Sequence, residues 1–146
     1  VLVMNCHIGP NTMLPYLKEI WYALKCHVAG LPITYRTTED HPTFFNLPDN
    51  NGCFCQSPHE TTFPTALDPM QCNRYEIGQF AKEAYSLGIN YLGVCCGANP
   101  MLIREVAEAV GLTVPASKYR EKMDNHYMFG INKRIPKHIK DYRTKA

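Results

Sequence analysis

The sequence has no long hydrophobic run and little excess of charge of either sign. No stretch of about 18 apolar residues occurs, so no membrane span is predicted. The formal net charge is only +2, and basic residues become frequent only near the C-terminus, without alternating with aromatic residues. This pattern argues against a nucleic-acid partner. The 146 residues, 45% of them hydrophobic, are instead sufficient for one globular core.

The sequence also lacks an even, regularly spaced set of cysteines. The seven cysteines are Cys6, Cys26, Cys53, Cys55, Cys72, Cys95 and Cys96. An odd number with irregular spacing argues against a fully paired disulfide framework. It favours free thiols in a reducing compartment, and we expect a cytoplasmic protein. Two or three of these thiols are then candidates for metal ligands.

The hydrophobic periodicity predicts strands that alternate with helices. Strands are expected over residues 1–6, 31–36 and 89–95, and helices over 12–29, 74–87, 100–110 and 133–143. This order indicates parallel β/α units. Three parallel strands alone would leave both edges of the sheet exposed. The predicted fold class is therefore α/β, with about three β/α units of a larger assembly such as a (β/α)8 barrel, which needs about 250 residues.

Residues 38–73 are predicted to form a long loop. Five prolines and the sequence Asn50-Asn51-Gly52 leave no room for a long regular element. Loops of this length inside a compact domain are uncommon and are usually functional or disordered. The four phenylalanines of this region are expected to pack against the rest of the protein: Phe44, Phe45, Phe54 and Phe63.

Three cysteines are placed where predicted strands end. Cys6 ends the first strand, and Cys95 and Cys96 end the last. The carboxyl ends of parallel strands meet at one edge of a sheet, so these thiols are candidates for a common site if the strands are neighbours. Flanking glycines would permit the bend that brings two adjacent side chains to one ion. Three thiolates on one zinc ion, with a fourth position open, are typical of a catalytic metal site. The alternative, small buried cysteines with no ligand role, stays open.

Other residues offer rival interpretations. Cys53, Cys55, Cys72 and His59 are candidates for a structural zinc site, although the spacing of the first two is shorter than usual. Loop cysteines without a role are the alternative. Cys26 is expected in a helix and in the core. His7 is either a fourth ligand, a hydrogen-bond donor to a ligand, or an ordinary polar residue of a turn.

Several segments resemble the zinc-dependent homocysteine S-methyltransferase family. Its first zinc cysteine lies in a segment like Met4-Asn5-Cys6-His7, and its cysteine pair in one like Gly93-Val94-Cys95-Cys96-Gly97. Further similar segments are Phe63-Pro64, Leu67-Asp68-Pro69, Arg74-Tyr75-Glu76-Ile77, residues 81–89 and residues 112–117. The resemblance covers residues 1–117, which are expected to be the C-terminal part of the homocysteine-binding barrel. Residues 118–146 match poorly and are expected to be a divergent basic extension.

The resemblance implies an enzyme, its metal and its substrates. Cys6, Cys95 and Cys96 would be the ligands of Zn²⁺. The methyl group of betaine, or of a related onium donor, would pass to homocysteine and give methionine. Two further residues are candidates for substrate contacts: Asn5, beside the first cysteine, and Val94, where the family often has glycine. The protein is expected to be a homo-oligomer or part of a larger assembly. The alternative is a catalytically inactive homologue that serves as a structural or binding component.

Overall fold

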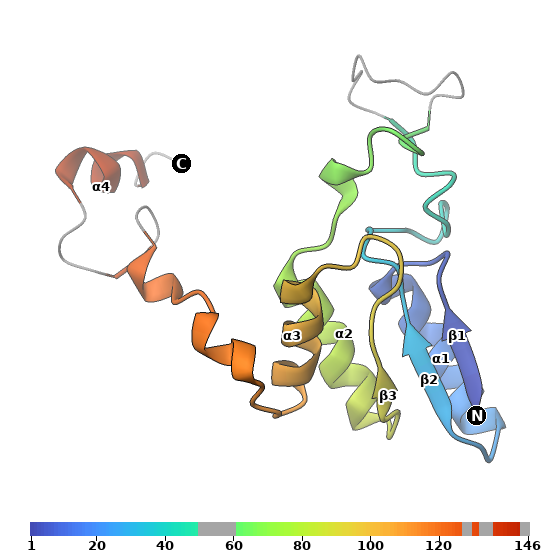
Figure 1. The fold of residues 1–146 in the computed structure, drawn as a ribbon. Coiled ribbons are helices and arrows are strands. Elements are labelled where there is room, and N and C mark those ends of the chain that lie inside the picture. Colours follow the sequence, from blue (N-terminus) through green and yellow to red (C-terminus); the bar gives the residue numbers. More distant parts are fainter. Residues whose placement is uncertain (50–60, 127–129, 132–135, 144–146) are drawn as a thin grey trace. The chain divides into compact units, whose positions relative to one another are not determined.

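The computed structural model describes residues 1–49, 61–126, 130–131 and 136–143. The chain divides into two compact units, Val1–Val114 and Pro115–Ala146. The sequence prediction placed a boundary after residue 117. The first unit contains the β-sheet and the three helices beside it (Figure 1). All three cysteines of the candidate metal site belong to this unit.

The first unit is built on a parallel sheet of three strands. These are β1 (Leu2–Asn5), β2 (Val28–Leu31) and β3 (Tyr91–Leu92), in the order β1-β2-β3. Leu2 pairs with Val28, and Ala29 pairs with Tyr91. The predicted parallel α/β architecture is therefore confirmed. The strands that lead to Cys6 and to Cys95 are not neighbours, however, because β2 lies between them.

Three helices accompany the strands. They are α1 (Pro10–Ala23), α2 (Arg74–Ser86) and α3 (Pro100–Ala109). Asn73 and Glu76 form a reciprocal capping box at the start of α2, which satisfies backbone N–H groups that would otherwise have no partner. Asn99 caps α3 by accepting a hydrogen bond from the backbone N of Leu102 at 3.0 Å. These local signals explain why the predicted starts of α2 and α3 agree with the structure.

Two apolar clusters hold the helices in place. The first joins α1 and α2 to the sheet and contains Met13, Leu17, Val28, Phe80, Ala84 and Ile89. The second lies between α2, α3 and the segment after β3 and contains Cys72, Ile77, Ala81, Val94, Leu102 and Val106. Full burial of a leucine or phenylalanine side chain contributes about 1.5–3 kcal/mol. Burial of these side chains therefore stabilises the packing of the three helices in the first unit.

The predicted helix over residues 12–29 is wrong at its C-terminal end. α1 ends at Ala23, and Val28 already belongs to β2. Gly30 does not terminate a helix: a Cβ there would lie 2.8 Å from a methyl of Leu17, so glycine lets α1 approach the strand. Pairing with β1 thus outweighs the helical periodicity of this segment. As a consequence, Cys26 is exposed in the connection rather than buried in a helix.

The strand predicted over residues 31–36 is misplaced, since it shares only Leu31 with β2, and the strand predicted over residues 89–95 is too long. β2 ends at Leu31 and β3 at Leu92. Pro32 has no N–H and interrupts the ladder. Strand-like bonds nevertheless continue beyond it: Cys95 N donates to Pro32 O at 2.7 Å, and Thr34 N donates to Cys96 O at 3.0 Å. The paired segments therefore extend past both strands to the cysteine pair.

The buried face of α3 contains the predicted Leu102 and Val106 but differs from the prediction at neighbouring positions. Ile103, expected in the core, is 48% exposed, whereas Arg104 and Glu105 are buried. Gly78 of α2 explains part of this arrangement, because a Cβ at that position would lie 3.0 Å from a carboxylate oxygen of Glu105. The absence of a side chain at Gly78 thus makes room for Glu105, a polar residue that the predicted apolar face did not include.

The described part of the loop over residues 38–73 agrees with the prediction of irregular structure. It contains one 3₁₀ helix, Asp68–Met70, and two isolated bridges. Phe44 and Leu47 are buried against Ile33, and Phe63 packs against the same cluster. The predicted packing of the loop phenylalanines is confirmed for Phe44 and Phe63. Phe45 is exposed and contacts the His7 ring and the other two phenylalanines, and Phe54 lies outside the described residues.

The second unit contains short elements. These are 3₁₀ helices over Pro115–Tyr119 and Met123–Asn125 and the helix α4 (Lys137–Arg143), which falls within the helix predicted over residues 133–143. Among the helices that the structure describes, none is both long and apolar enough to cross a bilayer.

Candidate metal centre

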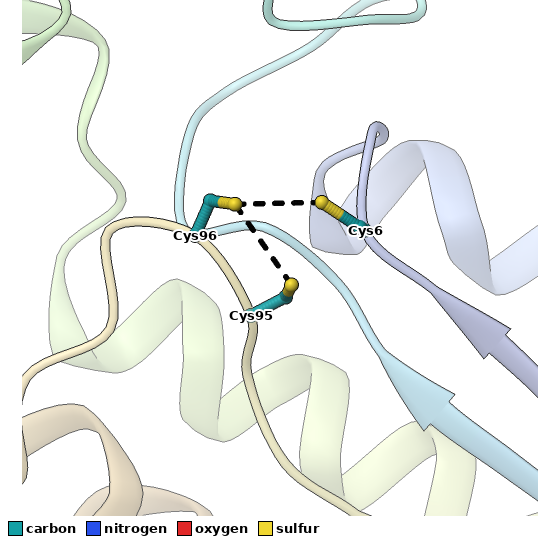
Figure 2. A group of neighbouring side chains, drawn as sticks. All are labelled: Cys6, Cys95 and Cys96. Atoms are coloured by element: carbon teal, nitrogen blue, oxygen red, sulfur yellow. Dashed lines mark hydrogen bonds between the residues drawn. The ribbon is translucent and has the colours of Figure 1, made fainter.

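Three cysteine side chains meet at the carboxyl edge of the sheet, the edge at which the parallel strands end. Figure 2 shows Cys6, from the turn after β1, facing Cys95 and Cys96, from the segment after β3. The sulfur of Cys96 lies 3.4 Å from that of Cys6 and 3.9 Å from that of Cys95. All three sulfurs lie within 4.8 Å of one another. Sulfurs on one tetrahedral zinc ion, bonded at about 2.3 Å, are about 3.8 Å apart, so the donor set fits such an ion.

The cysteines reach this position from strands that do not touch. Neighbouring strands are about 4.8 Å apart, so β1 and β3 are separated by roughly twice that distance. Each cysteine segment is bonded to the end of β2 or to the residue after it. Cys6 N donates to Leu31 O at 3.0 Å, and Cys95 N donates to Pro32 O at 2.7 Å. The thiols therefore approach one another from the two sides of β2.

The turn after β1 has an uncommon backbone conformation. Cys6 and His7 have φ values of 68° and 64°, in the left-handed region that non-glycine residues rarely adopt. Ile8 N donates to Cys6 O at 2.8 Å, and Phe44 N donates to His7 O at 3.1 Å. Each such residue costs on the order of 1–2 kcal/mol, and such conformations cluster at functional sites. The surrounding bonds hold the strained turn, which directs the Cys6 thiol toward Cys96.

A second turn presents the cysteine pair. Ala98 N donates to Cys95 O at 3.0 Å, and Gly97 has a φ of 79°. A Cβ at Gly97 would lie 2.2 Å from Thr34 Oγ1 and 2.9 Å from the ring of Tyr35. Both the backbone conformation and the lack of space therefore require glycine at this position. The bend expected at the glycines is found at Gly97.

Two polar residues that sequence reasoning missed hold this second turn. Thr34 donates to the carbonyl of Cys96 from both its backbone N, at 3.0 Å, and its Oγ1, at 3.2 Å. Gln71 Nε2 donates to the carbonyl of Gly97 at 3.1 Å. The side chain of Thr34 is fully buried. A polar residue that directly follows the apolar segment Leu31-Pro32-Ile33 was the only signal of this role in the sequence.

The thiols influence one another's protonation. Burial raises the pKa of Cys6, but hydrogen bonds from the backbone of His7 and from the thiols of Cys95 and Cys96 outweigh it, and this pKa lies below the ordinary thiol value. The hydrogen bond to Cys6, together with burial, raises the pKa of Cys96 to about 11. The close approach of the thiols therefore shifts the pKa values of Cys6 and Cys96 in opposite directions.

An ion pair lies between the segment that follows β2 and helix α2. Arg36, two residues after Thr34, donates to both carboxylate oxygens of Glu76 at 2.6 and 2.7 Å, and to Pro69 O at 3.4 Å. The hydrogen bond from Arg36 is the main cause that lowers the pKa of Glu76, and the backbone N–H of Asn73 adds to it. Glu76 also belongs to the capping box of α2. The segment beyond β2 is thereby connected to the start of α2.

Of the rival zinc site, the structure describes only Cys72, so that site stays a prediction. Cys72 is buried between α2 and α3, and burial raises the pKa of its thiol to about 12. Cys53, Cys55 and His59 lie outside the described residues. Within the described ranges, the side chains that lie close enough together to share a metal ion are those of Cys6, Cys95 and Cys96.

The remaining candidates occupy different surroundings. His7 is exposed, and its ring lies 5.5 Å from that of Phe45, an ordinary contact for a turn residue. Asn5 is exposed at the end of β1. Val94 is buried in the cluster between α2 and α3. The substrate contacts expected of Asn5 and Val94 stay predictions, and the position of Val94 in the core offers them no support.

Fold and site together define a parallel β/α protein with three thiols at the carboxyl edge of its sheet. A family model described as homocysteine S-methyltransferase matches residues 1–110. The chain belongs to this family.

Individual relatives agree with that assignment. The chain is 38% identical over 109 residues to a betaine–homocysteine S-methyltransferase 1 of Danio rerio, which is 74% of this chain and 25% of the relative. It is 32% identical to the Pongo abelii protein of the same name over 81% of this chain and 28% of the relative. An S-methylmethionine–homocysteine S-methyltransferase of Rattus norvegicus is 34% identical, over 81% of this chain and 32% of the relative. The chain thus spans roughly a quarter to a third of the length of these relatives.

Proposed function

We propose that Cys6, Cys95 and Cys96 bind one Zn²⁺ ion and that the protein transfers a methyl group to homocysteine. The observation that carries this proposal is the convergence of three sulfurs, within 4.8 Å of one another, from two strand ends. Three-thiolate coordination leaves one tetrahedral position for a substrate. In this proposal the chain is the C-terminal part of a (β/α)8 barrel, with its site at the face where such barrels carry their active sites.

The residues of this chain have distinct parts in the proposed reaction. When bound, zinc supplies a Lewis acid that keeps a substrate thiol deprotonated at neutral pH. Cys6, Cys95 and Cys96 hold the ion, and the hydrogen bonds of Thr34 and Gln71 to the second turn fix the cysteine pair. Fixed ligands reduce the reorganisation that the reaction requires. The sulfur of homocysteine forms a bond to the methyl carbon as the bond from that carbon to the donor breaks.

The donor is proposed to be betaine or a related onium compound. The relatives' names mention two donors, betaine and S-methylmethionine. In both, the methyl group is bonded to a positively charged atom, nitrogen or sulfur, which leaves as a neutral amine or thioether. Methionine is the product formed from homocysteine in either case. Assembly as a homo-oligomer, or within a larger complex, and cytoplasmic location stay predictions.

Replacement of Cys95 tests the metal site directly. We expect wild-type protein, purified under reducing conditions, to bind about one zinc per chain, as three thiolates on one ion imply. Cys95→Ala should lose nearly all of this zinc and all methionine formation, measured by elemental analysis and by product formation in the intact protein. The matched control is Cys72→Ala, which should keep the zinc because Cys72 lies in the core between α2 and α3.

The possible outcomes separate the hypotheses. Stoichiometric zinc in Cys95→Ala would contradict the proposed site. Loss of zinc in Cys72→Ala, with retention in Cys95→Ala, would favour a site that includes the loop cysteines. Zinc bound by the wild type without methionine formation would favour the inactive homologue.

A further inference from the structure

The turn that carries Cys6, called here the first turn (residues 6–9), ends where helix α1 begins. Gly9 is the N-cap residue of α1 and is buried. A buried backbone N–H needs a hydrogen-bond partner. For an N-cap residue this partner is often a long side chain at the third helical position, a place that the short side chain of Thr12 occupies in α1. The partner of the Gly9 N–H comes instead from a distant segment.

Two buried threonines satisfy this N–H group. Gly9 N donates to Thr37 Oγ1 at 2.8 Å. Thr12 Oγ1 donates to Thr37 O at 3.0 Å, and the two hydroxyl oxygens are 2.8 Å apart. Because the hydroxyl proton of Thr12 points to that carbonyl, the proton between the two hydroxyls comes from Thr37. Thr12 and Thr37 are only 9% and 8% exposed, so water competes little for these bonds.

The segment that contains Thr37 lies directly against the first turn. A Cβ at Gly9 would overlap the carbonyl oxygen of Tyr35 and would lie 2.9 Å from Thr37 Oγ1. Thr34, in the same segment, donates to the carbonyl of Cys96 in the second turn. The residues that follow β2 therefore contact both turns of the metal centre, with one threonine hydroxyl bonded to each.

The direction of the Cys6 thiol depends on the conformation of the first turn. The left-handed backbone of Cys6 and His7 persists only if surrounding contacts hold it. In this conformation the sulfur of Cys6 lies 3.4 Å from that of Cys96, near the separation of about 3.8 Å that one tetrahedral zinc ion requires. Loss of a residue that orients a metal ligand typically lowers metal affinity about tenfold to a hundredfold.

We propose that Thr37, oriented by Thr12, is a positioning residue of the metal centre. Its hydroxyl holds the first turn at Gly9, three residues after Cys6, and so keeps the Cys6 thiol directed toward Cys96. Thr37 touches neither the ion nor a substrate in this proposal, and it acts through the backbone of the turn. The inference rests on the proposed zinc site and adds the contact that orients one of its ligands.

Zinc affinity of the intact chain, measured by chelator competition, tests the proposal without reference to activity. Thr37→Val keeps nearly the same volume but leaves the Gly9 N–H without its acceptor. Its zinc affinity should fall by about threefold to tenfold, less than for a residue that is bonded to a ligand atom itself. Thr37→Ser keeps the hydroxyl and should restore the affinity of wild type. Thr12→Val is the second variant and should weaken zinc binding in the same direction.

Thr62→Val is the matched control for a structural effect. Thr62 is 2% exposed, and its Oγ1 donates to Leu47 O at 3.3 Å, so this buried hydroxyl is bonded to neither cysteine turn. The variant should lower the melting temperature about as much as Thr37→Val but keep the zinc affinity of wild type. Amide hydrogen exchange of the zinc-free chain measures the bond itself: exchange at Gly9 should be faster in Thr37→Val and unchanged in Thr62→Val.

Three results would overturn the proposal: unchanged zinc affinity in folded Thr37→Val, an equal loss of affinity in Thr62→Val, or a serine variant as weak as the valine variant. If Thr37→Val does not fold, Thr12→Val decides, and wild-type affinity in that variant would contradict the proposal. Failure of the proposed metal site has a different signature. Wild type would then bind no zinc, while exchange at Gly9 would still respond to the removal of the Thr37 hydroxyl.

Discussion

Cys72 and the three cysteines of the carboxyl edge show how surroundings decide the chemistry of one residue type. Cys72 is enclosed by Ile77, Ala81 and Leu102, and its pKa is raised to about 12. At the carboxyl edge, burial raises the pKa of Cys6, but hydrogen bonds with the backbone of His7 and with the thiols of Cys95 and Cys96 outweigh it and hold this pKa below the ordinary thiol value. Apolar burial thus raises the pKa of Cys72, whereas the hydrogen bonds among the convergent thiols lower the pKa of Cys6 and raise that of Cys96.

The largest expected effect is a difference in the rate of thiol alkylation between buried Cys72 and the exposed cysteines. At pH 8 a thiol of pKa about 12 is deprotonated in only about one molecule in ten thousand. We expect iodoacetamide to modify Cys72 at least about a hundredfold more slowly than the exposed Cys26. Residue-resolved mass spectrometry of the native chain measures both rates. Zinc should protect Cys6, Cys95 and Cys96, while Cys72 should be equally protected with and without zinc.

Denaturation provides the control for this experiment, since all cysteines should then react at similar rates. Modification of native Cys72 at the rate of Cys26 would show that its burial does not suppress the thiolate.

Substitution of Gly97 should disrupt the carboxyl edge specifically. A Cβ in Gly97→Ala would collide with Thr34 and Tyr35, so the turn that carries Cys96 must move. We expect a loss of about 2–4 kcal/mol in the free energy of unfolding, from overpacking and the left-handed backbone. Zinc affinity, measured by chelator competition, should fall at least about tenfold because a ligand is displaced.

Gly111 offers a matched control for that substitution. It has a φ of 88°, but nothing lies within 4 Å of the position of its Cβ. Gly111→Ala should cost only about 1 kcal/mol in stability and leave zinc affinity unchanged. Equal zinc affinities in the two variants would contradict the claim that the second turn places Cys96.

Removal of the Thr34 hydroxyl should have a smaller effect. Thr34→Val removes the side-chain donor to Cys96 O but keeps the backbone bond and nearly the same volume. We expect a loss of about 1 kcal/mol in stability and a zinc affinity lowered by a few fold. Thr34→Ser, which keeps the hydroxyl, should restore zinc affinity. A serine variant as weak as the valine variant would indicate a packing role only.

The smallest effect on stability is expected when the ion pair between Arg36 and Glu76 is removed. Because the pKa of Glu76 is lowered in the folded chain, the pair adds stability above the unfolded pKa of about 4.3 and loses it as the pH falls through the folded value. Arg36 is 43% exposed, so Glu76→Gln should cost no more than about 1 kcal/mol at neutral pH. Denaturant titrations at several pH values should show wild type and variant converging in acid. If the difference in stability between wild type and Glu76→Gln stayed the same below the pH at which Glu76 titrates, the electrostatic explanation would be contradicted.

The sequence predicted the elements with strong local signals. Asn73 and Asn99 cap helices that begin where expected, and cysteines at the strand ends meet as the parallel arrangement suggested. The boundary between α1 and β2 was mispredicted, because residues 24–30 continue a helical pattern while their partner strand is distant in sequence. Gly30 was interpreted as a helix stop, yet it allows close packing of Leu17.

The contacts that hold the two cysteine turns in place could not be predicted from the sequence. Thr34 and Gln71 have no motif, and their role depends on where two carbonyls of the second turn lie in space. The left-handed conformation of Cys6 and His7 was equally invisible, because non-glycine residues rarely adopt it. The sequence thus identifies the candidate metal-binding cysteines, whereas tertiary contacts determine how their side chains are oriented.

X-ray absorption at the zinc edge tests the central claim most directly. For the zinc-loaded wild type, the proposed site predicts three sulfur neighbours at about 2.3 Å and one lighter ligand. Addition of homocysteine should replace the lighter ligand and give four sulfurs. Two or fewer sulfurs before addition, or four sulfurs without homocysteine, would contradict a site built from Cys6, Cys95 and Cys96 with one position open to the substrate.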